Sequence, residues 1–472
     1  MNAVTSIHRK SLFGTIVLIL LVLYVILFLG LIIDDIKLDI PAIFHIAVYL
    51  VLYFYYLFTF RKANLLCFEF IFLAVYFLGM FFEELIPDEI LDFFIGVGGS
   101  RKYMITDPII NYKSFLSQMI GYLIFLFGCY KANVKKYVKK NDTIVNNSNL
   151  SSIGIIVYVL VAIILLFLVY YYVTGVFNSW FAYSDESILN EERNQGVGRL
   201  TDLTLTVTVV ELLRLNKRGV SNFWGFLRHT NKLYILEVLF ISSLLLLSGN
   251  RNEMLLIFLP VVVGYSVFVK KISNRLLLVG LCIGILVMIF SGLTRQSGDL
   301  LGAQFDLISS VQDFSLVGVD CTYLIKYTDS HDYIYFANFP LFILSGIPFI
   351  GPLIIHTMDL GFMSSSRLTT LAMSSNGTGL GTSLVGDLYY NGGILFVILF
   401  MFLFGYLVSY LYNKFNYCGC TNMFLALIYL YTISNSVYYV RQIFDFPIST
   451  IIFSSILIVI LFYIFNHGRI RI

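Results

Sequence analysis

Charged side chains at the ends of apolar stretches are the first residues in this sequence that could do chemistry. Arg251 and Glu253 lie in the short turn Ser-Gly-Asn-Arg-Asn-Glu-Met between two apolar runs. Arg441 lies in a similar turn, Tyr-Tyr-Val-Arg-Gln-Ile-Phe-Asp, and Arg295 and Arg367 lie in the polar segment between these turns. The planar guanidinium group of arginine binds phosphate oxygens bidentately and keeps its charge. The pattern predicts a phosphate or diphosphate site; the alternative is that each arginine is a loop charge neutralised by a nearby acid.

Aspartates recur every seven residues in the same polar segment, at positions 299, 306, 313 and 320. Seven residues return an α-helix to nearly the same face, and apolar residues fill much of the rest of this stretch. The spacing therefore predicts an amphipathic helix with an acidic ridge. Asp299 and Asp313, and separately Glu253, are candidates for a general base that takes the proton of a sugar hydroxyl. The alternative is a solvated face on a helix at the membrane interface.

The polar segment ends in a glycine-rich run over residues 376–393, Asn-Gly-Thr-Gly-Leu-Gly-Thr-Ser-Leu-Val-Gly-Asp-Leu-Tyr-Tyr-Asn-Gly-Gly. Glycine has no side chain, so such a backbone can approach a ligand closely. The run does not close a βαβ unit, which argues against a dinucleotide loop. Asp387 within it is a further candidate base, and aromatic faces and amides are typical of a sugar-binding cleft; the alternative is a helix entry with tyrosines at the membrane interface. The residues predicted to contact a sugar are Gly379, Gly381, Ser383, Tyr389, Tyr390 and Asn391.

Composition indicates what positions these residues. Of the 472 residues, 58% are hydrophobic and only 12% are charged, whereas a soluble domain has roughly 25% charged residues. Apolar runs long enough to cross a bilayer recur along the chain, which predicts an all-α polytopic membrane protein rather than a β-barrel. Twelve membrane helices are predicted, at residues 12–33, 41–60, 65–85, 115–130, 153–176, 203–215, 233–247, 254–269, 276–290, 394–411, 423–439 and 449–465.

Basic residues set the predicted orientation. They cluster on one side of the predicted spans, which places both termini in the cytoplasm by the positive-inside rule. The chain then divides into nine helices (1–291), a large external loop (292–393) and three helices (394–472). Within the loop, residues 342–355 carry two prolines and are predicted to be re-entrant, because a thirteenth span would place the C-terminal arginines outside. Residues 203–215 are short for a span, and they are counted as one because basic residues follow them.

Other kinds of site find little support in the sequence. It contains no Asp-X-Asp pair, which argues against a metal-dependent, nucleotide-sugar glycosyltransferase, and no P-loop, HExxH or GxSxG motif. The six cysteines lack the spacing of a zinc or redox site. We therefore expect no metal, no cofactor and no nucleic-acid partner.

The turn at residues 248–254, the large late loop and the run from Gly379 to Gly393 leading into a helix together resemble the Wzy-type polymerases of oligosaccharide repeat units. Members of this family make O-antigen and capsular polysaccharide. The resemblance implies glycosyl transfer at the external face of the bacterial inner membrane. The donor is a glycan on undecaprenyl diphosphate, and the acceptor is a repeat unit on the same carrier. Implied partners are these lipid-linked glycans and membrane lipid, and a polysaccharide chain-length regulator is a further candidate.

The resemblance also suggests roles for the residues above. Arg251, Arg295 and Arg441 would hold the diphosphate, with Arg367 as a fourth. The base would be Asp387 or one of the recurring aspartates, and the tyrosines near the end of the run would contact sugar. Two other functions fit the same features less well: an O-antigen ligase, which moves finished glycan from the carrier to the lipid A core, and a flippase for lipid-linked oligosaccharide.

Overall fold

Helices are the only regular secondary structure in the residues that the computed structural model of the chain describes. Those residues are 2–34, 41–60, 66–85, 107–134, 150–174, 191–247, 251–273, 307–335, 364–373, 382–417, 423–441 and 448–465, with isolated positions between 275 and 358. Every predicted span except 276–290, which lies largely outside them, coincides with a helix. The sequence therefore predicted the fold class correctly.

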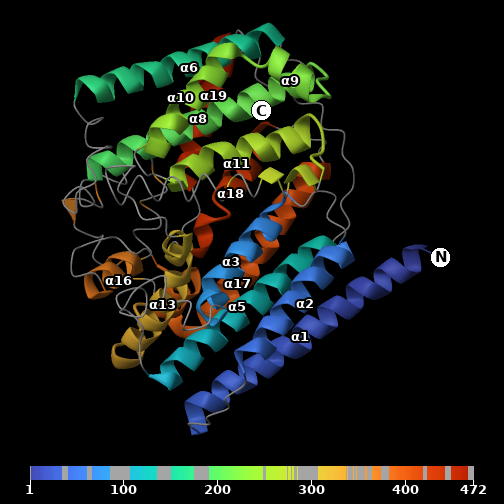
Figure 1. Cartoon of the computed structure of the whole chain (residues 1–472), viewed down its shortest axis with the longest axis vertical. Helices are drawn as coiled ribbons and strands as arrows, with labels where there is room; N and C mark the ends of the chain where they lie inside the picture. Colours follow the sequence, from blue (N-terminus) through green and yellow to red (C-terminus); the bar gives the residue numbers. More distant parts are fainter. Residues whose placement is uncertain are drawn as a thin grey trace.

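The helices form two groups that lie side by side (Figure 1). The first, here called bundle 1, comprises α1 (Asn2–Asp34), α2 (Ala42–Phe60), α3 (Phe68–Leu85), α5 (Pro108–Val134) and α17 (Leu384–Tyr417). The second, bundle 2, comprises α6 (Leu150–Val173), α8 (Glu191–Lys217), α10 (Lys232–Leu247), α11 (Arg251–Phe268), α18 (Met423–Ser434) and α19 (Ile448–Phe465). The short helix α9 (Phe223–His229) precedes α10. Helix α18 joins the groups, because it packs against both α17 and α11.

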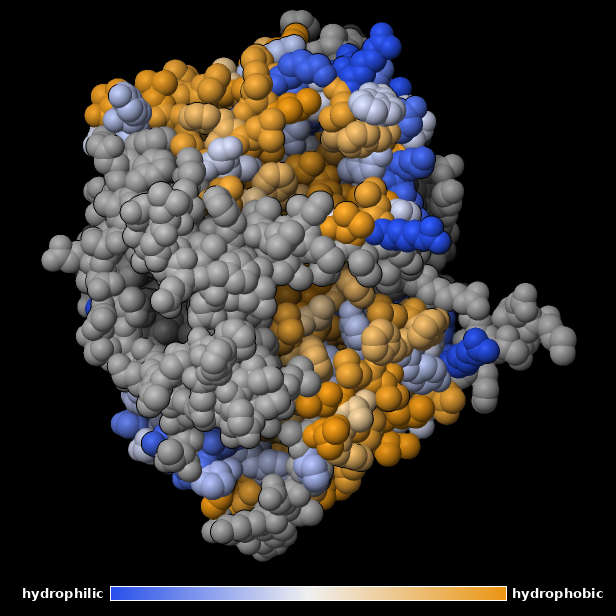
Figure 2. All heavy atoms as spheres, in the orientation of Figure 1, coloured by the Kyte–Doolittle hydropathy of each residue, from blue (hydrophilic) through white to orange (hydrophobic). Residues whose placement is uncertain are grey.

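Five of these helices are long and apolar enough to cross a membrane: α1, α2, α5, α6 and α17. Large apolar side chains such as Ile26 and Leu166 are exposed on α1 and α6. Figure 2 shows broad apolar areas on the upper and lower right parts of this face, with hydrophilic residues along the right edge and at the lower left. An apolar surface of this breadth is typical of contact with lipid. The total of twelve spans stays a prediction.

Glycines bring α5 and α17 into close contact. A Cβ atom on Gly405 of α17 would lie 2.2 Å from the carbonyl oxygen of Phe125, and one on Gly128 of α5 would lie 2.3 Å from that of Phe402. Between them the thiol of Cys129 lies 3.3 Å from the carbonyl oxygen of Gly405. Small residues let membrane helices approach backbone to backbone, where packing replaces the missing hydrophobic driving force. These contacts make α5 and α17 the axis of bundle 1.

Helix α8 is longer than its apolar run predicts. Residues 203–215 form only its C-terminal half, because the helix begins at Glu191 and ends at Lys217, which gives it a length of about 40 Å. Its threonines are buried against neighbouring helices: Thr204 donates to Glu237 of α10 over 2.9 Å, and Thr206 donates to Ser454 of α19 over 2.8 Å. A polar helix can therefore lie inside bundle 2, since its hydroxyl groups find partners there.

Helix α17 folds back on itself near its start. Gly392 and Gly393 are not helical, and Gly393 has φ +68°. Atoms of Val385 and Val397 lie 3.0 and 3.5 Å from the position of a Cβ on Gly121, although twelve residues of straight helix would separate them by about 18 Å. The helix is therefore a hairpin with a short arm, 384–391, and a long arm, 394–417. The sequence placed the start of this helix at residue 394, so it missed the short arm; the predicted re-entrant segment 342–355 lies largely outside the described residues.

Part of the predicted amphipathic helix is present as α13 (Leu307–Ser330), which contains Asp313 and Asp320, whereas Asp299 and Asp306 lie outside the described residues. It packs against α3, α5 and α17 and contacts the short helix α16 (Ser365–Met373). The end of bundle 1 where α3 finishes, α5 begins and α13 packs is called the α13 end below; in Figure 1, α13 and α16 lie together on the left. This end gathers the segments that carry most of the described candidate residues.

Candidate functional site

Three segments that are far apart in the sequence meet beside the start of the short arm of α17, within bundle 1. The backbone amide of Thr382 donates to the carbonyl oxygen of Arg441 over 3.3 Å. The hydroxyl of Thr382 donates to Ser365 over 3.1 Å, and Ser365 donates to Oδ1 of Asp387 over 2.7 Å. Arg441 directly follows the 3₁₀ turn η4 (Tyr438–Val440), and Ser365 begins α16. The structure thus brings Asp387 and Arg441 into one site.

Asp387 is held firmly at this site. Its side chain is 2% exposed and accepts the hydroxyl of Ser365. Its backbone amide donates to the carbonyl oxygen of Ser383 over 2.7 Å, and its own carbonyl accepts from the amide of Asn391 over 2.9 Å. The hydroxyl of Ser383 accepts the amide of Gly386, as a helix cap does. A carboxylate fixed in this way orients α16 against the short arm of α17.

A second acid, Asp320, lies beside the same segments on α13. Its side chain is 1% exposed, and neither carboxylate oxygen accepts a hydrogen bond from any described residue. Burial raises its pKa to about 8, although the nearby charge of Arg441 opposes the rise. Buried carboxylates without hydrogen bonds are costly and rare, and groups with such perturbed pKa values concentrate at functional sites. Asp320, with the charge of Arg441 nearby, is therefore the most unusual acid of the described site.

Small residues place Asp320 where it is. A Cβ on Gly386 would lie 3.0 Å from the Cα of Cys321, so α13 and the short arm of α17 approach backbone to backbone. A Cβ on Gly318 would lie 3.2 Å from the carbonyl oxygen of Gly79 on α3. Asp320 is consequently enclosed between α13 and its neighbours. The sequence marked it as the last of the recurring aspartates but did not single it out; its apolar neighbours Val319 and Cys321 were the signal that could have done so.

Two of the residues predicted to contact sugar, Tyr389 and Tyr390, are packed against residues 333 and 334, which follow α13. Tyr389 and Tyr390 are both buried. The ring of Tyr389 packs edge-on against Phe28 and Tyr333, with the ammonium group of Lys113 5.8 Å from its centre. Asn391 is also buried, and its Oδ1 accepts no hydrogen bond from the described residues. Direct contact of these three side chains with sugar stays a prediction, and the surface above them is formed by other residues.

The remaining candidates are placed only in part. Arg367 lies on α16 and is exposed. Arg251 and Glu253 begin α11, and Asp313 lies in the first half of α13, but their side chains are outside the described part of the chain. Arg295, Asp299, Gly379 and Gly381 lie outside it altogether. No group of three or more potential metal ligands occurs among the residues with described positions.

Comparison with known proteins adds one finding. The family model described as O-antigen polysaccharide polymerase Wzy matches residues 15–467, nearly the whole chain. No curated protein and no solved structure matches the chain. The matched residues include both bundles and the α13 end, so the family match is not confined to one part of the fold.

Proposed function

The chain belongs to the O-antigen polysaccharide polymerase Wzy family, and from this we propose that it joins repeat units carried on undecaprenyl diphosphate at the outer face of the inner membrane. Both termini would lie in the cytoplasm, and the α13 end would face the periplasm. Family membership supports polymerisation of O-antigen repeat units in general. The carrier, the face and the residues below are part of the proposal.

The proposed reaction needs one base and one cationic group. Ionised Asp320 would take the proton of the acceptor hydroxyl, and the oxygen would then bond to the anomeric carbon of the donor. The bond between that carbon and the diphosphate would break, and its electron pair would leave with the lipid diphosphate. Arg441 would bind this anion, since a guanidinium group stabilises phosphate oxygens through charge-assisted hydrogen bonds. Arg251, Arg295 and Arg367 remain candidates for further diphosphate contacts.

The observation that carries the proposal is the burial of Asp320 without a hydrogen bond from the described residues, near the charge of Arg441. Asp387 already accepts a hydroxyl and ties α16 to α17, whereas Asp320 accepts no hydrogen bond from the described residues. A general base works best when its pKa lies near the working pH, and the pKa of Asp320 is about 8. Asp320 thus takes the role of base ahead of Asp387, Asp313, Asp299 and Glu253.

Deletion of the gene in its host tests the function. The surface glycan is then separated on a gel. If the protein is a polymerase, deletion should replace the ladder by a single repeat unit on the lipid core. Expression of the wild-type gene should restore the ladder. A full ladder that stays on undecaprenyl diphosphate would show a ligase instead. Repeat units trapped on the cytoplasmic side would show a flippase.

A further inference from the structure

Aromatic side chains form a partly exposed ledge over the last turn of α13 and the residues that follow it. Its members are Tyr327, His331, Tyr333 and Tyr335, here called the tyrosine ledge. Tyr335 is 68% exposed and has φ +43°, in the left-handed region that aromatic residues rarely adopt. His331 is exposed as well. Unusual backbone conformations of this kind cost free energy and cluster at functional sites.

The ledge rests on the buried tyrosines of α17. The rings of Tyr327 and His331 stack with centres 4.1 Å apart and planes 6° apart, and Tyr327 packs edge-on against Tyr390. Tyr333 lies between Tyr389 and Tyr335, with ring centres 6.0 and 5.8 Å away. These contacts hold the rings in place before any ligand arrives, which lowers the entropy cost of binding.

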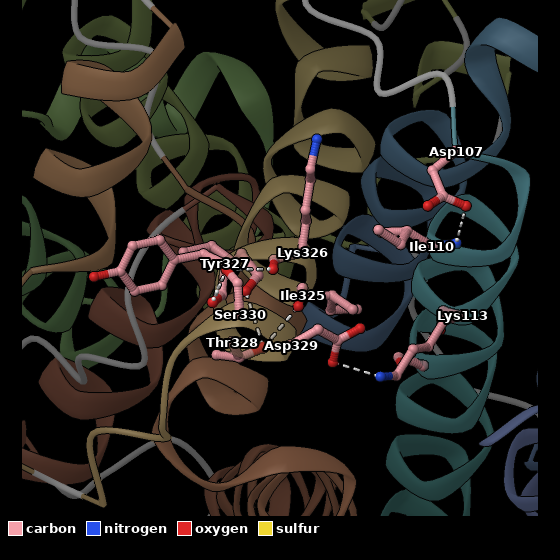
Figure 3. A network of polar contacts seen from close by, with 11 residues as sticks. Asp107, Ile110, Lys113, Ile325, Lys326, Tyr327, Thr328, Asp329 and Ser330 are labelled. Atoms are coloured by element: carbon pink, nitrogen blue, oxygen red, sulfur yellow. Dashed lines mark hydrogen bonds and ion pairs between the residues drawn. The ribbon is translucent and has the colours of Figure 1, made fainter. Parts of the chain in front are cut away.

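The backbone and an ion pair fix the ledge to bundle 1. The amide of Ile334 donates to the carbonyl oxygen of Tyr390 over 3.3 Å. At the end of α13, Asp329 accepts Lys113 of α5 over 2.5 Å, and Figure 3 shows this pair with Tyr327 and Ser330 nearby on the last turns of the helix. Ser330 and Asp332 are exposed beside the rings and supply polar groups. Rigid aromatic faces flanked by hydroxyl and carboxylate groups suit a saccharide, whose ring faces are apolar and whose edges are polar.

The distance from the proposed base indicates which sugars would reach the ledge. Asp320 and Ser330 are ten residues apart on α13, which places the ledge about 15 Å from Asp320 along the helix. That length fits a short oligosaccharide and not the reacting sugar itself. We propose that the tyrosine ledge binds the glycan chain at sugars beyond the reacting one and so retains it between successive additions. This inference rests on the proposed function and adds a binding site to it.

A membrane-interface role is the competing explanation, because tyrosines gather at both membrane surfaces. Tyr172 provides the matched control. It lies at the end of the candidate span of α6 and is 74% exposed, so it has the features of an interfacial tyrosine. A tyrosine that contacts lipid and one that contacts glycan would respond differently in a chain-length assay.

The test replaces Tyr335 in the full-length protein, expressed in the deletion strain. Tyr335→Asn removes the ring but keeps a residue that tolerates positive φ, and Tyr335→Phe keeps the ring. We expect Tyr335→Asn, alone and with His331→Ala, to shorten the most abundant chain at least twofold without abolishing polymer. Tyr335→Phe and Tyr172→Asn should give the wild-type ladder.

A direct measurement accompanies the gel. Polysaccharide released from the host lipopolysaccharide by mild acid is added to the purified protein in detergent, and saturation transfer is recorded by NMR. We expect saturation to pass from wild type and from Tyr335→Phe to the polysaccharide. With Tyr335→Asn the transferred saturation should fall at least twofold. An unchanged ladder and unchanged transfer in Tyr335→Asn would overturn the ledge alone. A ladder that survives gene deletion would overturn the proposed function and the ledge with it.

Discussion

Ser365 donates its hydroxyl to Oδ1 of Asp387 over 2.7 Å, and this bond ties the start of α16 to the short arm of α17. Thr382 in turn donates to Ser365, and its backbone amide reaches the carbonyl oxygen of Arg441. The chain of bonds runs across three segments that the sequence separates widely. Asp387 therefore has a structural role as a hydrogen-bond acceptor. Asp320 has no such role among the described residues, so substitutions at the two acids should have different effects.

Asp387→Asn should keep most of the polymer, whereas Asp387→Ala should not. The amide oxygen of asparagine can still accept the hydroxyl of Ser365, but alanine leaves this one buried hydroxyl without its acceptor, at a cost of about 1–3 kcal/mol. The melting temperature in detergent and the gel ladder measure the two effects. Loss of polymer in Asp387→Asn at wild-type stability would instead make the charge of Asp387 essential and return the role of base to it.

Asp320→Asn should abolish the polymer while the protein stays folded in the membrane. Asparagine has the shape of a protonated aspartate, so a purely structural acid would tolerate this change, but a base would not. Asp107→Asn is the control and should retain the ladder, because Asp107 is an exposed acid that caps the start of α5 and asparagine can cap a helix as well. Normal chains from Asp320→Asn would remove Asp320 from the reaction.

Asp320→Asn should become more stable relative to the wild-type protein as the pH rises. The pKa of Asp320 is raised from 3.8 to about 8 by burial. Below about pH 4 the carboxyl is protonated in both states and has no effect. Between these pKa values it is ionised only in the unfolded chain, so folding loses stability with rising pH, by up to roughly 5 kcal/mol above pH 8. Melting curves of both proteins from pH 5 to 9 should diverge in that direction; parallel curves would contradict it.

Arg441→Ala should lower polymerisation about 10- to 100-fold, the value of a lost charge-assisted hydrogen bond. Arg441→Lys should recover only part of the activity, because lysine keeps the charge but not the planar pair of donors. Arg228 lies on α9, the short helix that precedes α10, and its side chain is exposed. Arg228→Ala is therefore the control and should behave as wild type. Incorporation of labelled repeat units into polymer by membranes gives the rates. Full activity in Arg441→Ala would exclude Arg441 from diphosphate binding.

Gly405→Ala should destabilise bundle 1 by about 1–3 kcal/mol or more, because the new Cβ would lie 2.2 Å from the backbone oxygen of Phe125. Gly154→Ala on α6 is the matched control, since a Cβ there meets no atom within 4 Å. That change should be neutral or stabilise the helix by up to about 1 kcal/mol. The melting temperatures of the two variants are compared. Equal values would show that α5 and α17 can move apart to admit a methyl group without loss of stability.

Hydrophobic periodicity predicted most of the helices but not their polar parts. The apolar run 203–215 gave no sign that α8 continues to Glu191, because its threonines are satisfied by side chains from α10 and α19. Residues 384–391 look like a loop because Gly386, Asp387 and Asn391 are poor helix formers, yet buried neighbours and the Ser383 cap stabilise a helix there. Both are effects of tertiary contacts.

The candidate site was predictable to a similar degree. Arg441 was proposed from its turn between apolar runs and Asp387 from the glycine-rich run, and the structure brings their two segments together. Asp320 was missed because the seven-residue spacing suggests one face for all four aspartates, and only packing shows that this face is enclosed at Asp320. The ledge was missed because Tyr335 gains its significance from its backbone conformation and from the rings beneath it.

The fold-back of α17 has a consequence for how substrate and product would move. Gly121, where both arms of α17 meet α5, is the central residue of that helix, about 20 Å from either end. The short arm with Asp387 therefore starts halfway along α5, and in the proposed membrane orientation it would lie well below the level of the lipid headgroups. A lipid-linked diphosphate would have to enter sideways between helices, whereas the lengthening glycan would leave upward along α13 past Tyr335. Separate routes for the lipid carrier and the glycan would allow the spent carrier to diffuse into the membrane while the polymer stays bound to the protein.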